Sequence, residues 1–400
     1  MKILRIIGSV NPAGGGPIDG VWRTGDELER LGHRQDVLTM DAPDAEFLAD
    51  CPGHVIAMGR AANRRNSGAS WLYSLERRFS FSSRAIPWLK AHRHEYDVAI
   101  IEGLWNFSIM AARWALVGSE TPYLVFTHGM LDPWFKKHYP LKSVAKQISW
   151  IFNEGPLLRN AHRVLFTTEE EKLLARNCYW PYRISEQVVG YGAVDPPGDN
   201  IGQQVAAFRR TLPALGERRY VLYLSRIHEK KGCDLLIKAF ADYADQHADI
   251  DLVIAGPDQS GLKAFLQELA SELGVASRIH WPGMVTGDVK WGAYRAAQAF
   301  ILPSHQENFG VVVAEALACG LPVLISDKVN IWREVAAERA GFVAPDTLDG
   351  TRQLFKSLFA QSEAERLLMG RRGRTCFEGH FDIRMAAHAL EAAAESACLQ

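Results

Sequence analysis

The clearest chemical pattern in the sequence lies between residues 303 and 323, in the string PSHQENFGVVVAEALACGLPV. Glu307 is expected in a loop, where its carboxylate can accept hydrogen bonds from sugar hydroxyls. Asn308, Phe309 and Gly310 would present backbone N–H groups at a helix N-terminus, which suits polar or anionic ligands. Glu315 would follow inside that helix, where a carboxylate can accept both hydroxyls of a ribose. Each glutamate alone is more typical of a solvated helix surface, so the binding hypothesis depends on the whole string.

A second charged string, SRIHEKKG, occupies residues 225–232 directly after the apolar run YVLYL. Arg226 and Lys231 flank a loop that opens the next expected helix. A departing nucleoside diphosphate gains negative charge in the transition state, and fixed cations aimed at that charge lower the barrier without a metal ion. A basic turn after a strand is also common in proteins without such a site. The string therefore supports diphosphate binding mainly in combination with the glutamate string.

Three further groups follow expected strands in the first half of the chain. The NPAGGGP loop at residues 11–17 places Gly15 and Gly16 where a backbone can approach a ligand closely, although it lacks the spacing of a dinucleotide fingerprint. His128, in THGMLDPW, ends a strand beside a glycine, at the edge of the sheet where ligands bind. Glu102 and Trp105, in IEGLW, follow another strand and are predicted to line an acceptor pocket. The ordinary alternatives are a flexible turn and a structural histidine.

Parallel strands are the elements that must position these residues. Short β-branched runs alternate with longer amphipathic stretches along the chain, which predicts βαβ units and parallel sheets. The segment GYGAVDPPGDN, at residues 190–200, separates two such series and is rich in turn-forming residues. The predicted fold class is α/β, with two Rossmann-like doubly wound domains. The expected boundaries are 1–195, 196–380 and a final helix at 381–400 that packs back toward the first domain.

Composition narrows the function classes. A net charge of −1 over 400 residues argues against a nucleic-acid partner. The six cysteines are scattered without a CxxC pair, which indicates neither a disulfide framework nor a zinc site and favours a reducing compartment. No apolar run reaches the ~20 residues that span a bilayer, and the N-terminus lacks a signal-peptide pattern. A cytoplasmic location is therefore expected.

One motif points to a metal. Asp249, Ile250 and Asp251 match the D-x-D pattern with which other transferases hold a metal ion. They stand at the start of the expected strand DLVIA, at the edge of the sheet away from bound ligands. We interpret them as a solvated turn and expect no metal site and no cofactor.

In combination, SRIHEKKG and ENFGVVVAEALACGLPV resemble the motifs of the family 4 retaining glycosyltransferases with the GT-B fold. The resemblance runs from Gly14 to the final helix and is looser in the first half. THGMLDPW resembles bacterial members that build exopolysaccharide or lipopolysaccharide. The resemblance implies that the two domains face a central cleft, the first binding the acceptor and the second binding a nucleotide-sugar donor.

The resemblance also implies residue roles. Arg226 and Lys231 would hold the diphosphate, Glu307 would contact the transferred sugar, and Glu315 would bind the ribose. The remaining implied contacts are His128 near the reacting sugar, Gly15 and Gly16 against the donor phosphates and the acceptor, and Gly256 and the loop Pro282–Met284 along the donor cleft, the loop bordering the nucleobase.

The function expected from the resemblance is a retaining, metal-independent hexosyltransferase. It would move a hexose from a UDP- or GDP-sugar to a glycan or polyprenyl-linked acceptor in bacterial polysaccharide biosynthesis. A nucleotide-sugar 2-epimerase is an alternative, because it has two similar domains and also needs cations around a diphosphate. A non-catalytic nucleotide-sugar-binding protein is a third candidate.

Two segments of the first half mix basic with apolar residues. Between Arg60 and Arg93 there are eight basic residues and one acid, Glu76, together with several aromatic side chains. In HYPLKSVAKQISWIF, apolar residues recur at helical spacing and Lys142 and Lys146 lie on another face. Peripheral contact with anionic lipid, on the inner face of the plasma membrane, is one interpretation. The other is that the apolar stripe faces the core.

Overall fold

The structure is a computed structural model that describes residues 1–60 and 80–399. The chain divides into two compact units, Met1–Tyr191 with Ile383–Gln400 and Gly192–Asp382. Each unit has its own parallel sheet, which confirms the predicted α/β class with two doubly wound domains. The sequence-based boundary at 195/196 lies in the same Gly- and Pro-rich segment as the observed division.

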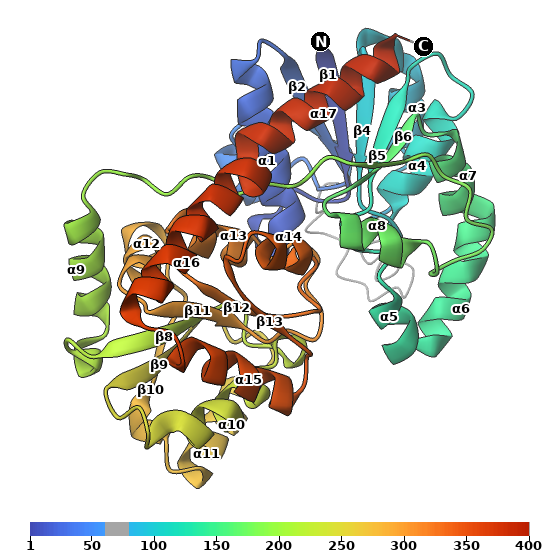
Figure 1. Ribbon diagram of the computed structural model, residues 1–400. Helices are drawn as coiled ribbons and strands as arrows, with labels where there is room; N and C mark the ends of the chain where they lie inside the picture. The colour runs from blue at the N-terminus through green and yellow to red at the C-terminus, as the bar shows by residue number, and fades with distance from the viewer. Residues whose placement is uncertain (61–79, 400) are drawn as a thin grey trace. The chain divides into compact units, whose positions relative to one another are not determined.

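The first sheet has the strand order β3-β2-β1-β4-β5-β6-β7, and each pair of neighbouring strands is parallel (Figure 1). Its strands are β1 (Lys2–Ile7), β2 (Arg34–Thr39), β3 (His54–Ala57), β4 (Val98–Glu102), β5 (Tyr123–Phe126), β6 (Arg163–Phe166) and β7 (Glu186–Val188). The helices of this unit are α1 (Gly16–Arg30), α3 (Ala85–His92), α4 (Phe107–Leu116), α5 (Pro133–His138), α6 (Pro140–Ser149), α7 (Gly155–Asn160), α8 (Glu169–Ala175) and α17 (Ile383–Cys398), with a π-helical turn at Trp150–Glu154.

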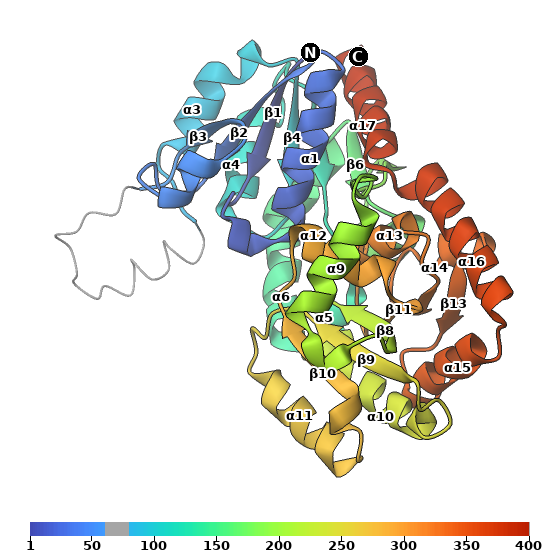
Figure 2. The same ribbon diagram turned by 90° about the vertical axis from the view of Figure 1, so that its left-hand side faces the viewer.

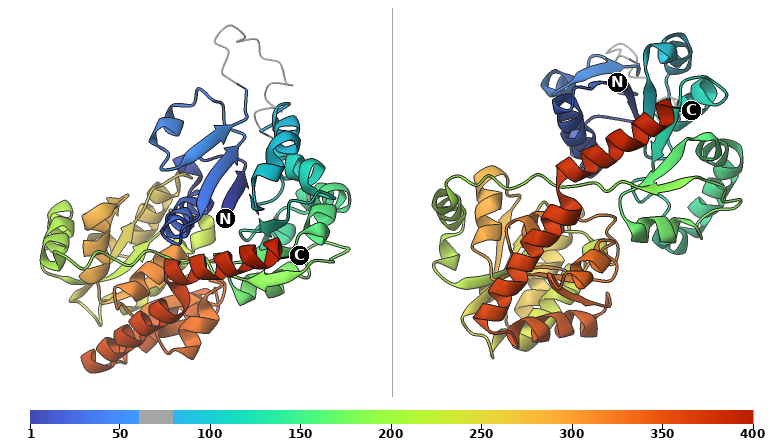
Figure 3. Two further views of the ribbon diagram at one scale, coloured as in Figure 1. Left: turned by 90° about the horizontal axis from the view of Figure 1, so that it is seen from above. Right: turned by 45° about the horizontal axis from the view of Figure 1, so that its top comes forward.

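Apolar residues on both faces of each central strand explain this layered arrangement. In β1, Leu4 and Ile6 belong to the core that packs against α3, α4 and α7. Ile3 points to the opposite core, where Leu390 and Ala394 of α17 cover the sheet. Strands covered on both faces read as continuous apolar runs, and that is how these strands read in the sequence. The final helix is therefore part of the first unit, where it lies beside α1 (Figure 3).

The second sheet has the order β10-β9-β8-β11-β12-β13 and is also parallel. Its strands are β8 (Arg219–Leu224), β9 (Ile250–Ala255), β10 (Ile279–Gly283), β11 (Ala299–Leu302), β12 (Val323–Ser326) and β13 (Gly341–Ala344). Its helices are α9 (Ile201–Thr211), α10 (Cys233–Ala244), α11 (Leu262–Glu272), α12 (Gly287–Arg295), α13 (Val311–Ala318), α14 (Trp332–Ala337), α15 (Leu348–Phe359) and α16 (Glu363–Cys376), followed by a π-helical turn at Phe377–Phe381. Helices α9 and α12 pack side by side (Figure 2).

The sequence pattern missed β13, an edge strand that begins with glycine and is mostly half-buried, so it does not read as a continuous buried apolar run. Among the described residues, no helix is long and apolar enough to cross a membrane.

Candidate functional site

Each sheet has one point where its strand order reverses. In the second unit the chain leaves β8 toward β9 and β10 and then returns to its other side with β11. In the first unit the corresponding point lies between β1 and β4. Open α/β sheets bind ligands outside the carboxyl ends of the strands at such a point. The loops after β8, β11, β1 and β4 are therefore the places where functional side chains should gather.

In the second unit, Lys231 and Glu307 form an ion pair across this point. Lys231 ends the loop after β8, and Glu307 lies in the loop after β11. The lysine side chain is 8% exposed and the glutamate side chain 20% exposed, so little water screens the pair. Gly232 allows the loops to approach, because a Cβ there would lie 2.2 Å from the carbonyl oxygen of Pro303. The structure thus joins two residues that the sequence had assigned to different ligand groups.

Arg226, in the same loop, is exposed and forms no ion pair with a carboxylate of the described residues. The main chain around it is fixed, since Ile227 N–H donates to the carbonyl of Pro257. Burial lowers the pKa of His228, and the positive charges of the neighbouring Lys230 and Arg226 lower that pKa further. The loop after β8 therefore presents a positive field that suits a diphosphate.

The loop after β11 leads into α13 through Gly310, which has φ +80°. Glu307 is held there by its backbone, which donates to the carbonyl of Lys328 and accepts from Asn330 N–H. Phe309 is buried, and its ring packs edge-on against Phe381 at a centroid distance of 5.6 Å. Asn308 lies between Glu307 and Phe309 in the chain. The N–H groups at the start of α13 thus stand beside Glu307, as the sequence string indicated.

Glu315 lies within α13 and is buried. Lys290 Nζ is 2.7 Å from one carboxylate oxygen, and the Tyr294 hydroxyl is 3.2 Å from the other. Burial and then the negative charge of Glu315 raise the pKa of Tyr294 well above its ordinary value, so the phenol stays protonated. Sequence analysis missed both partners. Their spacing of four residues puts them on one face of α12, but nothing in it points to Glu315.

The other donor-side residues predicted from the sequence border the same sheet edge. Gly256 follows β9 with φ +139°, and a Cβ there would lie 1.8 Å from the carbonyl oxygen of Ser225. Glycine is therefore required by the loop contact itself, whatever ligand binds. Met284 follows β10 and is 70% exposed, so its side chain is available to a ligand.

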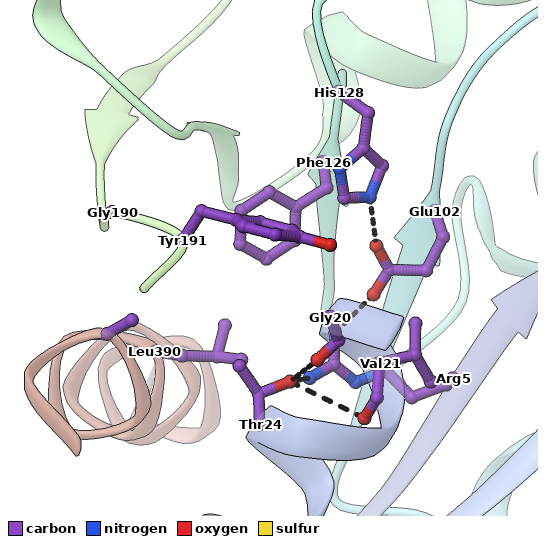
Figure 4. Close-up of a pocket in the computed structure, with 11 residues that line it drawn as sticks. Arg5, Gly20, Val21, Thr24, Glu102, Phe126, His128, Gly190, Tyr191 and Leu390 are labelled. Carbon is purple, nitrogen blue, oxygen red and sulfur yellow. Dashed lines mark hydrogen bonds and ion pairs between the residues drawn. The ribbon is translucent and has the colours of Figure 1, made fainter. Parts of the chain in front are cut away.

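In the first unit, buried charged residues link β1, β4 and the loop after β5. The Arg5 guanidinium pairs with Glu102, and His128 Nε2 lies 2.6 Å from the other carboxylate oxygen of Glu102 (Figure 4). Arg5 also donates to Thr24 Oγ1 at 2.8 Å and to Gln35 Oε1 at 3.1 Å. These groups line or border a small pocket.

The charge of Glu102 decides the tautomer of His128. Burial alone would raise the pKa of Glu102, but Arg5 and His128 outweigh burial and hold that pKa below its ordinary value. An ionised carboxylate only accepts hydrogen bonds, so His128 must carry its proton on Nε2. Nδ1 is then left as the second ring nitrogen for a ligand. Glu102 was predicted to line an acceptor pocket; it is one of the residues that line the small pocket, but it is 2% exposed, and its carboxylate is engaged by Arg5 and His128.

A second buried carboxylate holds the main chain around His128. Glu171 accepts from Thr127 Oγ1 at 2.7 Å and from Gly129 N–H at 2.6 Å. These bonds clamp both neighbours of His128, which has the unusual φ of +48°. Sequence analysis missed Glu171, because it lies in a helix among ordinary-looking glutamates.

The glycine loop lies next to this network. Gly15 has φ +76° and precedes α1, and a Cβ built on it would meet no atom of the described residues within 4 Å. The Tyr191 hydroxyl donates to the carbonyl of Gly16, and the Tyr191 ring stands edge-on to His128 at 6.1 Å. The structure therefore brings the glycine loop and His128 to one edge of the first sheet.

Trp105 packs against Met130, Tyr179 and Lys146. It has φ +67°, and its indole N–H donates to the carbonyl of Met130 at 3.4 Å. Its ring packs against Tyr179 at 5.1 Å and against the Lys146 ammonium at 4.8 Å. The side chain is half-buried in an aromatic cluster, which leaves only part of it accessible to an acceptor.

The interpretation of Asp251 as a solvated residue is wrong. It is 1% exposed in β9 and accepts from Arg218, Arg278 and His280. Asp249 pairs with Arg219 at the surface. The D-x-D string therefore consists of one structural clamp and one surface ion pair. Within residues 1–60 and 80–399, no three or more His, Cys, Asp and Glu side chains group as metal ligands.

Comparison with known proteins places these features in a family. Residues 15–192 match the family model described as glycosyl transferase 4-like domain, and residues 205–366 match glycosyl transferases group 1. The D-inositol 3-phosphate glycosyltransferase of Salinispora tropica is 40% identical over 204 residues, which cover 48% of this chain and 42% of the relative. An uncharacterized glycosyltransferase of Methanocaldococcus jannaschii is 34% identical over 134 residues, 34% of each chain.

The chain matches only part of the curated relatives, between 34% and 56% of each relative's own length. Solved structures match over nearly the whole chain. Sucrose-phosphate synthase from Thermosynechococcus elongatus has a TM-score of 0.74 at 20% identity and covers 99% of this chain and 98% of its own. HepE from Anabaena, in complex with UDP and glucose, has a TM-score of 0.74 at 18% identity and covers 99% and 100%. At these identities the structural matches show the fold alone.

Each domain matches a glycosyltransferase model, the two models follow one another along the chain, and the fold is that of solved glycosyltransferases of the GT-B type. The chain therefore belongs to the family 4 glycosyltransferases with the GT-B fold.

Proposed function

We propose that this chain is a retaining hexosyltransferase that uses a UDP- or GDP-sugar and needs no metal ion. The proposed acceptor is a glycan or a polyprenyl-linked sugar of bacterial polysaccharide biosynthesis. The HepE structure that shares its fold is in complex with UDP and glucose, which supports a uridine nucleotide as the first donor to test. All six cysteines are free thiols, which supports a reducing compartment.

The ion pair of Lys231 and Glu307, beside the exposed Arg226, is the observation that carries the proposal. A diphosphate would compete with Glu307 for the Lys231 ammonium, and Arg226 would add a second cation. Glu307 would then be released to accept hydrogen bonds from hydroxyls of the donor sugar. A ligand that carries a diphosphate next to a sugar offers an anion to Lys231 and hydroxyl groups to Glu307. Inorganic phosphate offers only the first, and a free sugar offers only the second.

The proposed reaction breaks the bond between the anomeric carbon and the diphosphate oxygen. The acceptor hydroxyl oxygen bonds to that carbon from the same face, and its proton passes to the departing diphosphate oxygen. Arg226 and Lys231 stabilise the charge that grows on the diphosphate, which is the role a divalent ion has elsewhere. His128, held by Glu102 and Glu171, would contact the reacting sugar through the ring or main chain.

The experiment starts with UDP- and GDP-sugars tested by thermal shift, because a ligand at 100 times its Kd stabilises by about 2.7 kcal/mol. The stabilising donor is then incubated with the protein alone, and the products are followed by NMR. Slow release of the sugar with its α or β configuration kept is the expected result. Formation of a C2 epimer would replace the proposal with an epimerase, and binding without any turnover, with or without glycan acceptors, would favour a sensor.

A further inference from the structure

A stripe of apolar side chains on α6 and the turn after it faces outward. Its members follow one another at helical spacing, and the exposure of its five larger side chains ranges from 46% for Ile151 to 87% for Leu141. We call this set the α6 stripe: Leu141, Val144, Ala145, Ile148, Ile151 and Phe152. The structure thus excludes the interpretation in which the stripe packs into the core of the first unit.

The opposite side of the same helical segment carries the packing. Ser143 and Trp150 are buried there, and the Trp150 indole N–H donates to the carbonyl of Pro181 at 2.9 Å. The side chain of Gln147 hydrogen-bonds both the N–H and the carbonyl of Trp180. This brings Trp180, 77% exposed, beside α6. The helices α5 and α6 lie at the end of the first unit opposite the two termini (Figure 1).

The charges around the stripe are positive. Between Pro133 and Thr168 the sequence has one acid, Glu154, and this residue is buried and bonded to Ser149 and Asn153. Lys136 and Lys142 are exposed, and neither pairs with a carboxylate in the described part of the chain. A face with exposed Leu, Ile and Phe, bordered by lysines and by tyrosine and tryptophan rings, matches the polarity of an anionic bilayer surface.

A second copy of the chain fits this face less well. Two-fold pairing would place the same lysines against each other, and the face offers no exposed carboxylate among the described residues to neutralise them. A bilayer instead supplies an apolar layer for the stripe and negative headgroups for the lysines, which can extend their ammonium groups toward the water.

We propose that the α6 stripe inserts into the interfacial region of an anionic membrane and holds the first unit there. Most of the basic segment between Arg60 and Arg93 lies outside the described residues. The inference does not depend on the proposed transfer reaction, because it concerns a different surface and is measured without a donor.

The test is cosedimentation of the full chain with vesicles of phosphatidylcholine, alone or mixed with phosphatidylglycerol. Binding is expected for the mixed vesicles at low salt and should fall steeply as salt is added. The pair Lys136→Gln and Lys142→Gln should weaken partitioning by about fivefold per lysine. The pair Leu141→Gln and Phe152→Gln should weaken it by more than about tenfold.

The matched control is Leu367→Gln with Phe265→Gln, two apolar side chains of the second unit that are 61% and 55% exposed. This pair should bind vesicles like the wild type. Absence of binding to mixed vesicles at low salt overturns the proposal, as does an equal loss in the control pair. A wild-type dimer that the Leu141 and Phe152 variant converts to a monomer would assign the face to a second copy. The lysine pair keeps the test decisive if the apolar variant folds poorly.

Discussion

Glu102→Gln keeps the shape of a buried side chain and removes the negative charge that Arg5 and His128 share. The Arg5 side chain is 2% exposed, so water cannot replace the lost carboxylate. It also donates hydrogen bonds to the neutral oxygens of Thr24 and Gln35. We therefore expect this change to lower both the stability of the first unit and the turnover number, for two separate reasons.

The stability loss follows from the uncompensated charge. Removing one partner of a buried ion pair typically lowers the free energy of unfolding by about 3–5 kcal/mol. Because Arg5 retains other hydrogen bonds, we expect a loss of about 3 kcal/mol. For a unit of about 200 residues, each kcal/mol lowers Tm by about 2–4 °C, so we expect a decrease of about 6–12 °C.

The activity loss follows from the histidine. A glutamine amide can donate to Nε2 as well as accept from it, so His128 is no longer held in one tautomer. We expect kcat to fall by about two orders of magnitude, with a smaller change in the donor KM, because a displaced contact to the reacting sugar typically costs about 10²-fold.

The two effects separate in a double variant. Adding Arg5→Met removes the orphaned charge, so part of the lost Tm should return, while kcat should stay low because His128 still lacks its carboxylate. The control is Glu169→Gln, which breaks the surface pair with Lys172 and should cost less than about 1 kcal/mol. Calorimetry and steady-state kinetics measure both. A Tm shift for Glu102→Gln no larger than that of the control would refute the reasoning.

Other predictions test the second unit. Arg226→Ala and Lys231→Ala should each lower kcat by about 10²–10³-fold, because the charge they oppose develops as the bond breaks, and near wild-type turnover in both would remove the diphosphate assignment. Activity should survive EDTA; its full loss, with recovery on adding Mg²⁺ or Mn²⁺, would contradict the metal-independent proposal. Burial would raise the pKa of Asp251, but Arg218, His280 and Arg278 outweigh it and lower that pKa. The stabilisation by Asp251 should therefore be present above the unfolded pKa near 3.9 and be lost as pH falls through the lower folded value, and Asp251→Asn should flatten the acid limb of a Tm-versus-pH curve.

Much of the architecture could be predicted from local pattern. Apolar runs such as Tyr220–Leu224 are typical of strands covered on both faces, and the Gly- and Pro-rich segment at 190–200 marks the end of the first series. Parallel strands bring their carboxyl ends to one edge, so Lys231 and Glu307 could be expected at the same edge although 76 positions separate them. The edge strand β13 begins with glycine and is mostly half-buried, so it does not read as one of these apolar runs.

Partner choice among buried charges could not be predicted in this way. Glu102 follows a strand, as expected, but its burial against Arg5 depends on a contact between residues 97 positions apart. The same holds for Glu315 with Lys290 and for Glu171 under the main chain of His128. Residue types show which groups are able to pair, while only the packed chain shows which of them water no longer reaches.

The α6 stripe shows the same division most clearly. The sequence by itself determined that apolar residues line one side of a helix, because they recur with the helical period. It also determined the order of strands and loops that carries the charged strings to the sheet edges. Only the tertiary structure decided that the stripe points outward and that Trp150, on the other side, fills the core. A period defines a face of an element, but which medium meets that face depends on contacts with segments far away in the chain.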